Sequence, residues 1–188
     1  MEKKKFFTVR NIAVLGVLTA LVFVMTYIGI DIPGPLGKTK LHFGNVMCLL
    51  SSLLFGPAMG SLAAGFGSAL FDLQDPAWAP EFWLTFLNKA SMALVAGLIM
   101  HKVKFGSEKV RVWAAGLCGS VTYCLLYVAK NIFSGVLVKG FAWDVAITET
   151  LVTKLPVTLV NGVLAVICAG VLTLALRPAL KKAHILEV

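Results

Sequence analysis

Nine polar or charged side chains lie within or beside the long apolar stretches of this 188-residue sequence. They are Asn45, Asn88, Lys89, Tyr127, Lys130, Asn131, Glu149, Lys154 and Asn161. Such groups are costly at membrane depth and tend to face a cavity or the interior of a helix bundle. Amides give directional hydrogen bonds and aromatic rings give stacking surface, a mixture that suits an organic solute better than an inorganic ion. The set therefore predicts a pocket for a small organic molecule.

The residues predicted to bind the ligand are the amides together with the aromatic residues near the predicted pocket mouth: Asn45, Trp83, Asn88, Tyr127, Asn131, Trp143 and Asn161. Each of them has an ordinary structural alternative. A single amide at depth can serve as a structural hydrogen bond, a lysine can extend to the membrane surface, and a tryptophan can belong to the interfacial belt. Glu149 and Lys154 could also simply pair with each other.

The sequence offers no pattern typical of an enzyme or a metal site. We find no paired carboxylates at depth, no Ser/His pair at helical spacing and no H-E-x-x-H. The four cysteines lie in apolar stretches without C-x-x-C spacing, and the three histidines are scattered. A phosphate loop is also excluded, because Ile32 stands where the GPLGKT segment would need a glycine. We therefore expect no catalysis, no metal and no cofactor bound by this chain.

Composition identifies an integral membrane protein. The chain is 59% hydrophobic and 14% charged, whereas a soluble domain is about a quarter charged. Its mean hydropathy is +0.88. The length allows roughly six spans in one domain, residues 1–188. The predicted fold is an all-α bundle of six transmembrane helices, and the net charge of +8 reflects membrane topology rather than nucleic-acid binding.

The central stretch, residues 42–73, predicts two apolar helices separated at Gly56-Pro57. Proline suits the first turn of a helix, and glycine suits the end of the preceding one. Other spans are expected at 12–30, 82–100, 112–128 and 149–176, with loops at 31–41, 72–81 and 101–111 and a connector at 130–146. Gly56, Gly60, Ala64 and Ser68 form a ridge of small residues that favours close helix packing.

Basic residues predict the orientation in the membrane. With six spans, 11 of the 17 Lys and Arg residues share one side with both termini. They are Lys3, Lys4, Lys5, Arg10, Lys102, Lys104, Lys109, Arg111, Arg177, Lys181 and Lys182. Basic segments that flank spans stay in the cytoplasm, so both termini are predicted to be cytoplasmic. The pocket then opens outward.

Three segments together resemble the substrate-binding membrane subunits, or S components, of energy-coupling factor (ECF) vitamin transporters. They are the stripe Gly16-x-x-x-Ala20 in the first span, the segment SSLLFGPAMGSLAAGFGSALFDL, and KLPVTLVNGVL at 154–164. The likeness covers nearly the whole chain. The family usually has alanine where Gly16 stands, and glycine is sterically compatible with close helix docking.

The resemblance implies a substrate-binding subunit of an ECF-type ABC transporter in a bacterial plasma membrane. It implies that the loop at 31–41, together with the adjoining His42, is a lid over the ligand, with Pro33, Lys38, Lys40 and His42 as its residues. It also implies a docking face made of Ala13, Gly16 and Ala20. The implied partner is a module of one transmembrane scaffold protein and two cytoplasmic ATPases that consume ATP and Mg. The helix pair favours cobalamin or another corrinoid as the vitamin; riboflavin, pyridoxine or a queuosine precursor would fit as well. A stand-alone facilitator, a membrane enzyme and a scaffold subunit without a ligand remain alternatives.

Overall fold

The computed structural model describes residues 8–34, 37–183 and 185–186. Its elements run in the following order: α1 (Val9–Tyr27), β1 (Gly29–Gly34), β2 (Gly37–His42), α2 (Gly44–Phe55), α3 (Pro57–Asp72), the 3-10 turn η1 (Ala79–Glu81), α4 (Phe82–Lys102), α5 (Glu108–Leu137), α6 (Trp143–Glu149), the π-helical segment η2 (Thr150–Lys154) and α7 (Leu155–Lys182). α6, η2 and α7 form one continuous helical rod of 40 residues.

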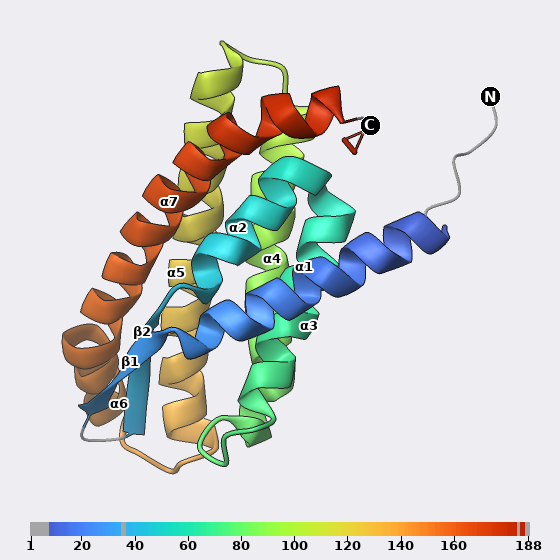
Figure 1. The fold of residues 1–188 in the computed structure, drawn as a ribbon. Coiled ribbons are helices and arrows are strands. Elements are labelled where there is room, and N and C mark those ends of the chain that lie inside the picture. Colours follow the sequence, from blue (N-terminus) through green and yellow to red (C-terminus); the bar gives the residue numbers. More distant parts are fainter. Residues whose placement is uncertain (1–7, 35–36, 184, 187–188) are drawn as a thin grey trace.

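The centre of the bundle is α2, although it has only 12 residues. Ten of these are buried, and Leu49 and Leu53 are fully enclosed together with Met92 of α4 and Val112 of α5. A helix surrounded by other helices needs apolar residues on every side, which explains its uninterrupted apolar sequence. Figure 1 shows α2 between α1, α4, α5 and α7.

The predicted break at Gly56-Pro57 is confirmed. Gly56 has φ of +89°, a conformation that side chains disfavour, and Pro57 occupies the first turn of α3. The ridge of small residues is buried as predicted, at Gly60, Ala64 and Ser68. A Cβ atom added to Gly60 would overlap Ser52 Cα, so α2 and α3 approach too closely for any larger residue.

Fewer helices are long enough to span a membrane than the six spans predicted from the sequence. In the part of the chain that the structure describes, four helical stretches are long and apolar enough to cross a membrane: Val9–Tyr27, Ala79–Lys102, Glu108–Leu137 and Trp143–Lys182. At 1.5 Å per residue, α2 and α3 reach only about 18 and 24 Å, less than the ~30 Å hydrocarbon core. α2 and α3 form an antiparallel helix pair inside the bundle. Six full spans therefore stay a prediction.

The all-α prediction and the 31–41 loop need a correction. This segment lies in an antiparallel β-hairpin, with Gly29 opposite His42 and Gly34 opposite Gly37. The prolines and glycines of this segment suggested a loop. A β-ladder is formed by backbone N–H and C=O groups, however, so these residue types do not prevent the two strands from pairing. The predicted 130–146 connector is also largely helical, because α5 continues to Leu137 and α6 begins at Trp143.

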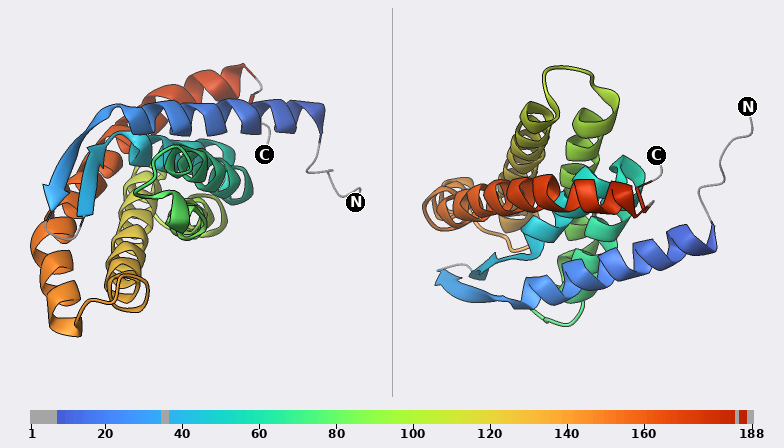
Figure 2. Two further views of the ribbon diagram at one scale, coloured as in Figure 1. Left: turned by 90° about the horizontal axis from the view of Figure 1, so that it is seen from below. Right: turned by 45° about the horizontal axis from the view of Figure 1, so that its top comes forward.

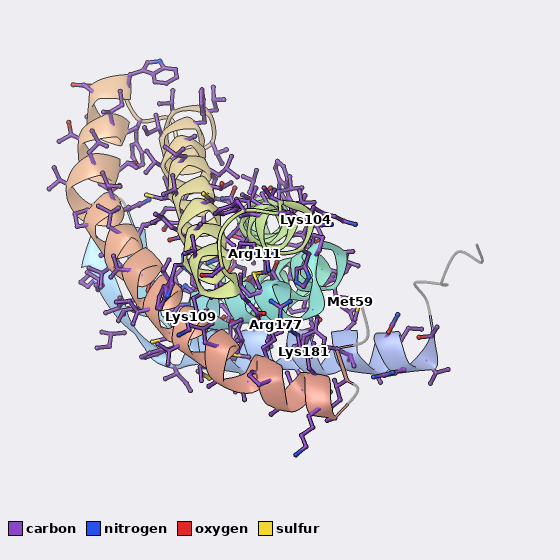
Figure 3. The ribbon with its side chains drawn as sticks, turned by 90° about the horizontal axis from the view of Figure 1, so that it is seen from above. Met59, Lys104, Lys109, Arg111, Arg177 and Lys181 are labelled. Atoms are coloured by element: carbon purple, nitrogen blue, oxygen red, sulfur yellow. The ribbon has the colours of Figure 1, made fainter. Side chains whose placement is uncertain are left out.

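The hairpin lies at one end of the bundle, and the α4–α5 loop lies at the other (Figure 1). The turn between α2 and α3 and the end of α7 also belong to the second end. Seen from that end, Lys104, Lys109, Arg111, Arg177 and Lys181 gather there, as the grouping of basic residues predicted (Figure 3). Lys3, Lys4 and Lys5, which also support the predicted orientation, lie outside the described residues.

The start of α1 and the end of α7 lie on the same side of the molecule (Figure 2). Arg10 Nη2 donates a hydrogen bond of 3.3 Å to the Ile185 carbonyl across this junction. α1 is the least enclosed of the four long helices: 17% of its most apolar window is buried, against 33% in each of the others.

Candidate functional site

A cavity of about 230 Å³ lies at the hairpin end of the bundle. Its wall includes six lysines, two carboxylates, three amides and four aromatic rings: Lys38, Lys40, Lys89, Lys130, Lys139, Lys154, Asp72, Glu81, Asn88, Asn131, Asn161, Phe71, Trp78, Tyr123 and Tyr127. The usual organic-ligand pocket is mostly apolar with a few polar groups, so this wall, which combines aromatic rings with many charged and amide groups, is more polar than usual.

Helical periodicity brings these side chains to the same side. On α5, Tyr123, Tyr127 and Lys130 follow at steps of four and three residues, which places them on one face. Thr158 and Asn161 line the cavity from α7 in the same way. The extended backbone of β2 carries Lys38 and Lys40 two residues apart, so both lie on the same side of the hairpin.

Asn161 anchors the hairpin to α7. Its Oδ1 accepts a hydrogen bond of 2.9 Å from the backbone N–H of His42, and its Nδ2 donates one of 2.8 Å to the carbonyl of Lys40. Both groups belong to β2. One amide side chain thus holds the second strand over the cavity from a position 119 residues away in the sequence.

A second attachment joins the hairpin to the loop after α3. Lys38 Nζ lies 2.6 Å from Asp75 Oδ2 and 3.4 Å from Asp31 Oδ2. The hydrogen bond from Lys38 lowers the pKa of Asp75 below its ordinary value, helped by the Ala77 backbone N–H. The same ammonium lies 4.5 Å from the centroid of the Trp78 ring, which places this tryptophan at the cavity wall. We call this contact the Lys38–Asp75 latch.

His42 ends the hairpin beside the cavity. The pKa of His42 lies well below its ordinary value. Burial of the ring away from solvent is the largest cause, and the positive charges of Lys89 and Lys40 add to it. The neutral ring accepts a hydrogen bond of 3.0 Å at Nδ1 from the backbone N–H of Gly44. His42 therefore joins the hairpin to the first turn of α2 without adding charge.

Ion pairs neutralise several of the wall lysines. Lys130 Nζ lies 2.5 Å from Glu81 Oε2, and Lys154 Nζ lies 3.6 Å from Glu149 Oε2. Lys154 also donates a hydrogen bond of 2.9 Å to Asn131 Oδ1. The structural pairing considered for Glu149 and Lys154 is thus present, and Lys154 lines the cavity at the same time.

Most of the predicted binding residues line this cavity. Asn88, Tyr127, Asn131 and Asn161 do so, and so do Lys38, Lys40 and His42 of the predicted lid. Within the residues that the structure describes, no cluster of three His, Cys, Asp or Glu side chains could hold a metal ion.

Four predicted residues lie elsewhere. Asn45 is fully buried beneath the cavity, where its Oδ1 accepts a hydrogen bond from Lys89. Trp83 is 53% exposed and borders an apolar groove between α3 and α4. Trp143 packs edge-on against Phe133, and Pro33 pairs with Lys38 in the hairpin.

Several cavity residues were not predicted as binding residues. Tyr123 lies one helical turn before Tyr127 on the same face of α5, a spacing that could have identified it. Phe71 and Trp78 also line the cavity, with ring centroids 5.9 Å apart. Their sequence context, at the end of α3 and in the loop that follows, gave no comparable signal.

The predicted docking residues lie on an open face of α1. Ala13, Gly16 and Ala20 are all exposed, and a Cβ added to Gly16 would meet no other atom within 4 Å. The buried side chains of α1 are Leu18, Val22 and Thr26, at four-residue steps on another face. A smooth strip of small residues is therefore available on the surface; we call it the α1 face.

Comparison with known proteins identifies the family. Residues 6–178 match the family model described as "ECF-type riboflavin transporter, S component". The chain belongs to this family. S components are subunits of transporters rather than enzymes, and the four long apolar helices agree with a multi-pass membrane protein.

Two further similarities agree with this assignment. A solved structure described as "Structure and mechanism of the S component of a bacterial ECF transporter" has a TM-score of 0.68 to this chain and is 23% identical. The match covers 90% of this chain and 96% of that one, so the S-component fold is the same. An uncharacterized protein of Pyrococcus woesei is 32% identical over 101 residues. That match covers 53% of this chain and 64% of the relative.

Proposed function

We propose that this S component captures a small vitamin or vitamin precursor in the cavity beneath the β1–β2 hairpin and releases it inward after docking onto an ECF module. That module would contain one transmembrane scaffold protein and two cytoplasmic ATPases that hydrolyse ATP with Mg. The observation that carries the proposal is the cavity itself, lined by aromatic and polar side chains and covered by a hairpin with polar attachments. This chain supplies binding and docking, and its partners supply the energy.

Cavity size supports a compact vitamin over a corrinoid. The volume of about 230 Å³ lies slightly below the usual range for pockets of drug-sized ligands, and a corrinoid is far larger than such ligands. The paired rings Tyr123–Tyr127 and Phe71–Trp78 offer surfaces for a flat heteroaromatic ring. Riboflavin, for which the matched family is described, and pyridoxine are both flat heteroaromatic vitamins.

The α1 face is the proposed contact with the scaffold protein. Small residues let two membrane helices approach closely, and such a contact is made of many weak van der Waals terms. A smooth face of this kind permits both assembly and release. Its position on a helix with little burial of its own leaves room for a partner.

The basic end of the molecule supports the proposed orientation. Lys104, Lys109, Arg111, Arg177 and Lys181 would face the cytoplasm by the positive-inside rule, close to the ATPases (Figure 3). The hairpin and the cavity would then face the exterior, where the vitamin arrives.

The test is a panel of vitamins titrated by calorimetry against the purified chain in nanodiscs, combined with co-purification with its ECF module. We expect tight binding of one compact vitamin and a stable complex with the module. Absence of complex formation, or transport by the chain alone in vesicles without ATP, would overturn the proposal.

A further inference from the structure

The inference concerns the charge of the ligand, and it rests on the proposed function. Lys89 lies in the middle of α4, is 4% exposed and lines the cavity. An ionisable side chain at membrane depth is expensive, and is usually retained for a functional reason.

The immediate partners of Lys89 are neutral. Its Nζ donates a hydrogen bond to Asn45 Oδ1 and lies 4.0 Å from the centroid of the Tyr123 ring. The amide oxygen and the face of the ring each carry only partial negative charge, so they offset a positive charge incompletely. Asp72 also lines the cavity and attracts Lys89 electrostatically, but its carboxylate bonds to Thr85 and forms no ion pair with Lys89 among the described residues.

Four other lysines of the wall differ in this respect. Lys38, Lys40, Lys130 and Lys154 each form an ion pair with a carboxylate. Lys139, the remaining one, is exposed to solvent. Among the described residues, Lys89 is therefore the buried cavity lysine without a carboxylate partner.

The site thus has one buried ammonium beside aromatic surface that no carboxylate contacts within ion-pair distance among the described residues. An ammonium in a region of low dielectric gains most from a full negative charge placed in contact with it. Asn45 accepts a hydrogen bond from the ammonium of Lys89, and the rings of Tyr123 and Tyr127 line the same cavity. This is the arrangement expected around a ring that carries an acidic substituent.

We propose that Lys89 binds an anionic oxygen of the substrate, so that the transported vitamin carries a carboxylate, a phosphate or an ionised ring hydroxyl. A neutral vitamin would leave the ammonium of Lys89 without a negative group in contact with it, because Asp72 attracts it only from beyond ion-pair distance. The substrate class is therefore a compact organic anion, which narrows the proposed function from neutral vitamins such as riboflavin and pyridoxine to their anionic derivatives or to another anionic vitamin.

The experiment uses matched pairs of ligands that differ in charge: riboflavin 5′-phosphate against riboflavin, 4-pyridoxate against pyridoxine, and pantothenate against pantothenol. Each pair is titrated at pH 7 against the wild-type chain, Lys89→Gln and Lys89→Arg in nanodiscs. The control is Lys102→Gln, which removes a positive charge from the exposed end of the same helix. Co-purification with the ECF module is measured for every variant.

We expect at least one anionic member to bind the wild-type chain more tightly than its neutral partner. The Lys89→Gln variant should lose roughly 10- to 100-fold of that affinity, the value of a charge-assisted hydrogen bond. Lys89→Arg should retain most of the preference, and Lys102→Gln all of it.

Equal or tighter binding of the neutral members, no binding of any anionic member, or an unchanged preference in Lys89→Gln would overturn the inference. In the last case Lys89 would serve only to hold Asn45. The proposed function is judged separately, because assembly with the module and binding of a neutral vitamin would support it whatever the role of Lys89.

Discussion

The attachment of the hairpin by Asn161 allows a quantitative prediction. Replacement of Asn161 by alanine removes two hydrogen bonds, to the His42 N–H and to the Lys40 carbonyl. Each is worth about 1 kcal/mol net, so the closed hairpin should lose about 2 kcal/mol relative to the open one. That is roughly a 30-fold rise in the population of the open hairpin.

Hydrogen exchange of the ligand-free protein in nanodiscs measures this change directly. We expect amides of β2 to exchange about 30-fold faster in Asn161→Ala, with amides of α2 unchanged as an internal reference. Asn131→Ala is the matched control, since Asn131 also lines the cavity but bonds to Tyr127 and Lys154 rather than to the hairpin. Unchanged protection of β2, or equal loss in both variants, would refute the role assigned to Asn161.

Three further predictions address docking, packing and pH. Gly16→Leu should weaken co-purification with the ECF module and leave vitamin binding intact, because it fills the α1 face away from the cavity; loss of binding with normal assembly would contradict the assignment. Gly97→Val should lower the free energy of unfolding by about 1–3 kcal/mol, because even a Cβ at Gly97 would lie 2.5 Å from Pro57 Cα. Thermal denaturation measures this loss, and an unchanged melting temperature would argue against the close approach of the two helices. Asp75 has a lowered pKa in the folded state, so the Lys38–Asp75 latch is complete above its ordinary value of 3.8 and is lost as pH falls through the lower folded value. The protection factors of β2 amides, which correct for the pH dependence of intrinsic exchange, should fall over that acidic range in the wild-type protein but not in Asp75→Asn, which lacks the titrating group.

The sequence predicted best where a local signal decides the structure. Gly56-Pro57 ends one helix and starts another through the backbone preferences of those two residues, and the structure has the break at that step. Small residues at four-residue spacing likewise predicted the close contact of α3 with its neighbours. Neither conclusion needed knowledge of the rest of the chain.

The β1–β2 hairpin was missed because the residues that attach it to the bundle are distant from it in the sequence. Two hydrogen bonds from Asn161 and the ion pair with Asp75 hold β2 in place, and neither is visible in the 31–41 segment itself. In the same way, Lys130 and Asn131 suggested the start of a connector because they are polar. In the structure they continue α5 and face the cavity, where Lys130 pairs with Glu81.

The direction in which a helical side chain points explains why two predicted residues of α4 lie in different places. Trp83 and Asn88 were both assigned to the pocket, yet five residues correspond to about 140° around a helix. They cannot face the same cavity from one straight helix, and the structure places Asn88 inside and Trp83 outside. Residue type indicated that both were important, but only the helical phase shows which of the two side chains lines the cavity.

The separation between polar lid contacts and apolar core has a consequence for gating. The polar contacts that hold the hairpin include those of Asn161, the Lys38–Asp75 latch and the 3.4 Å contact between the Thr39 and Tyr127 hydroxyls, whereas the bundle is held by buried apolar residues such as Leu49 and Met92. Opening the hairpin therefore costs about 2 kcal/mol for the two hydrogen bonds and up to about 1 kcal/mol for an ion pair with partial exposure. A total of about 3 kcal/mol leaves the open form populated at roughly 1% or less, within the usual range for a minor conformer that admits a ligand. Because these contacts lie outside the apolar core cluster, the proposed lid can open while the long helices and the α1 face, the proposed docking surface, keep their structure.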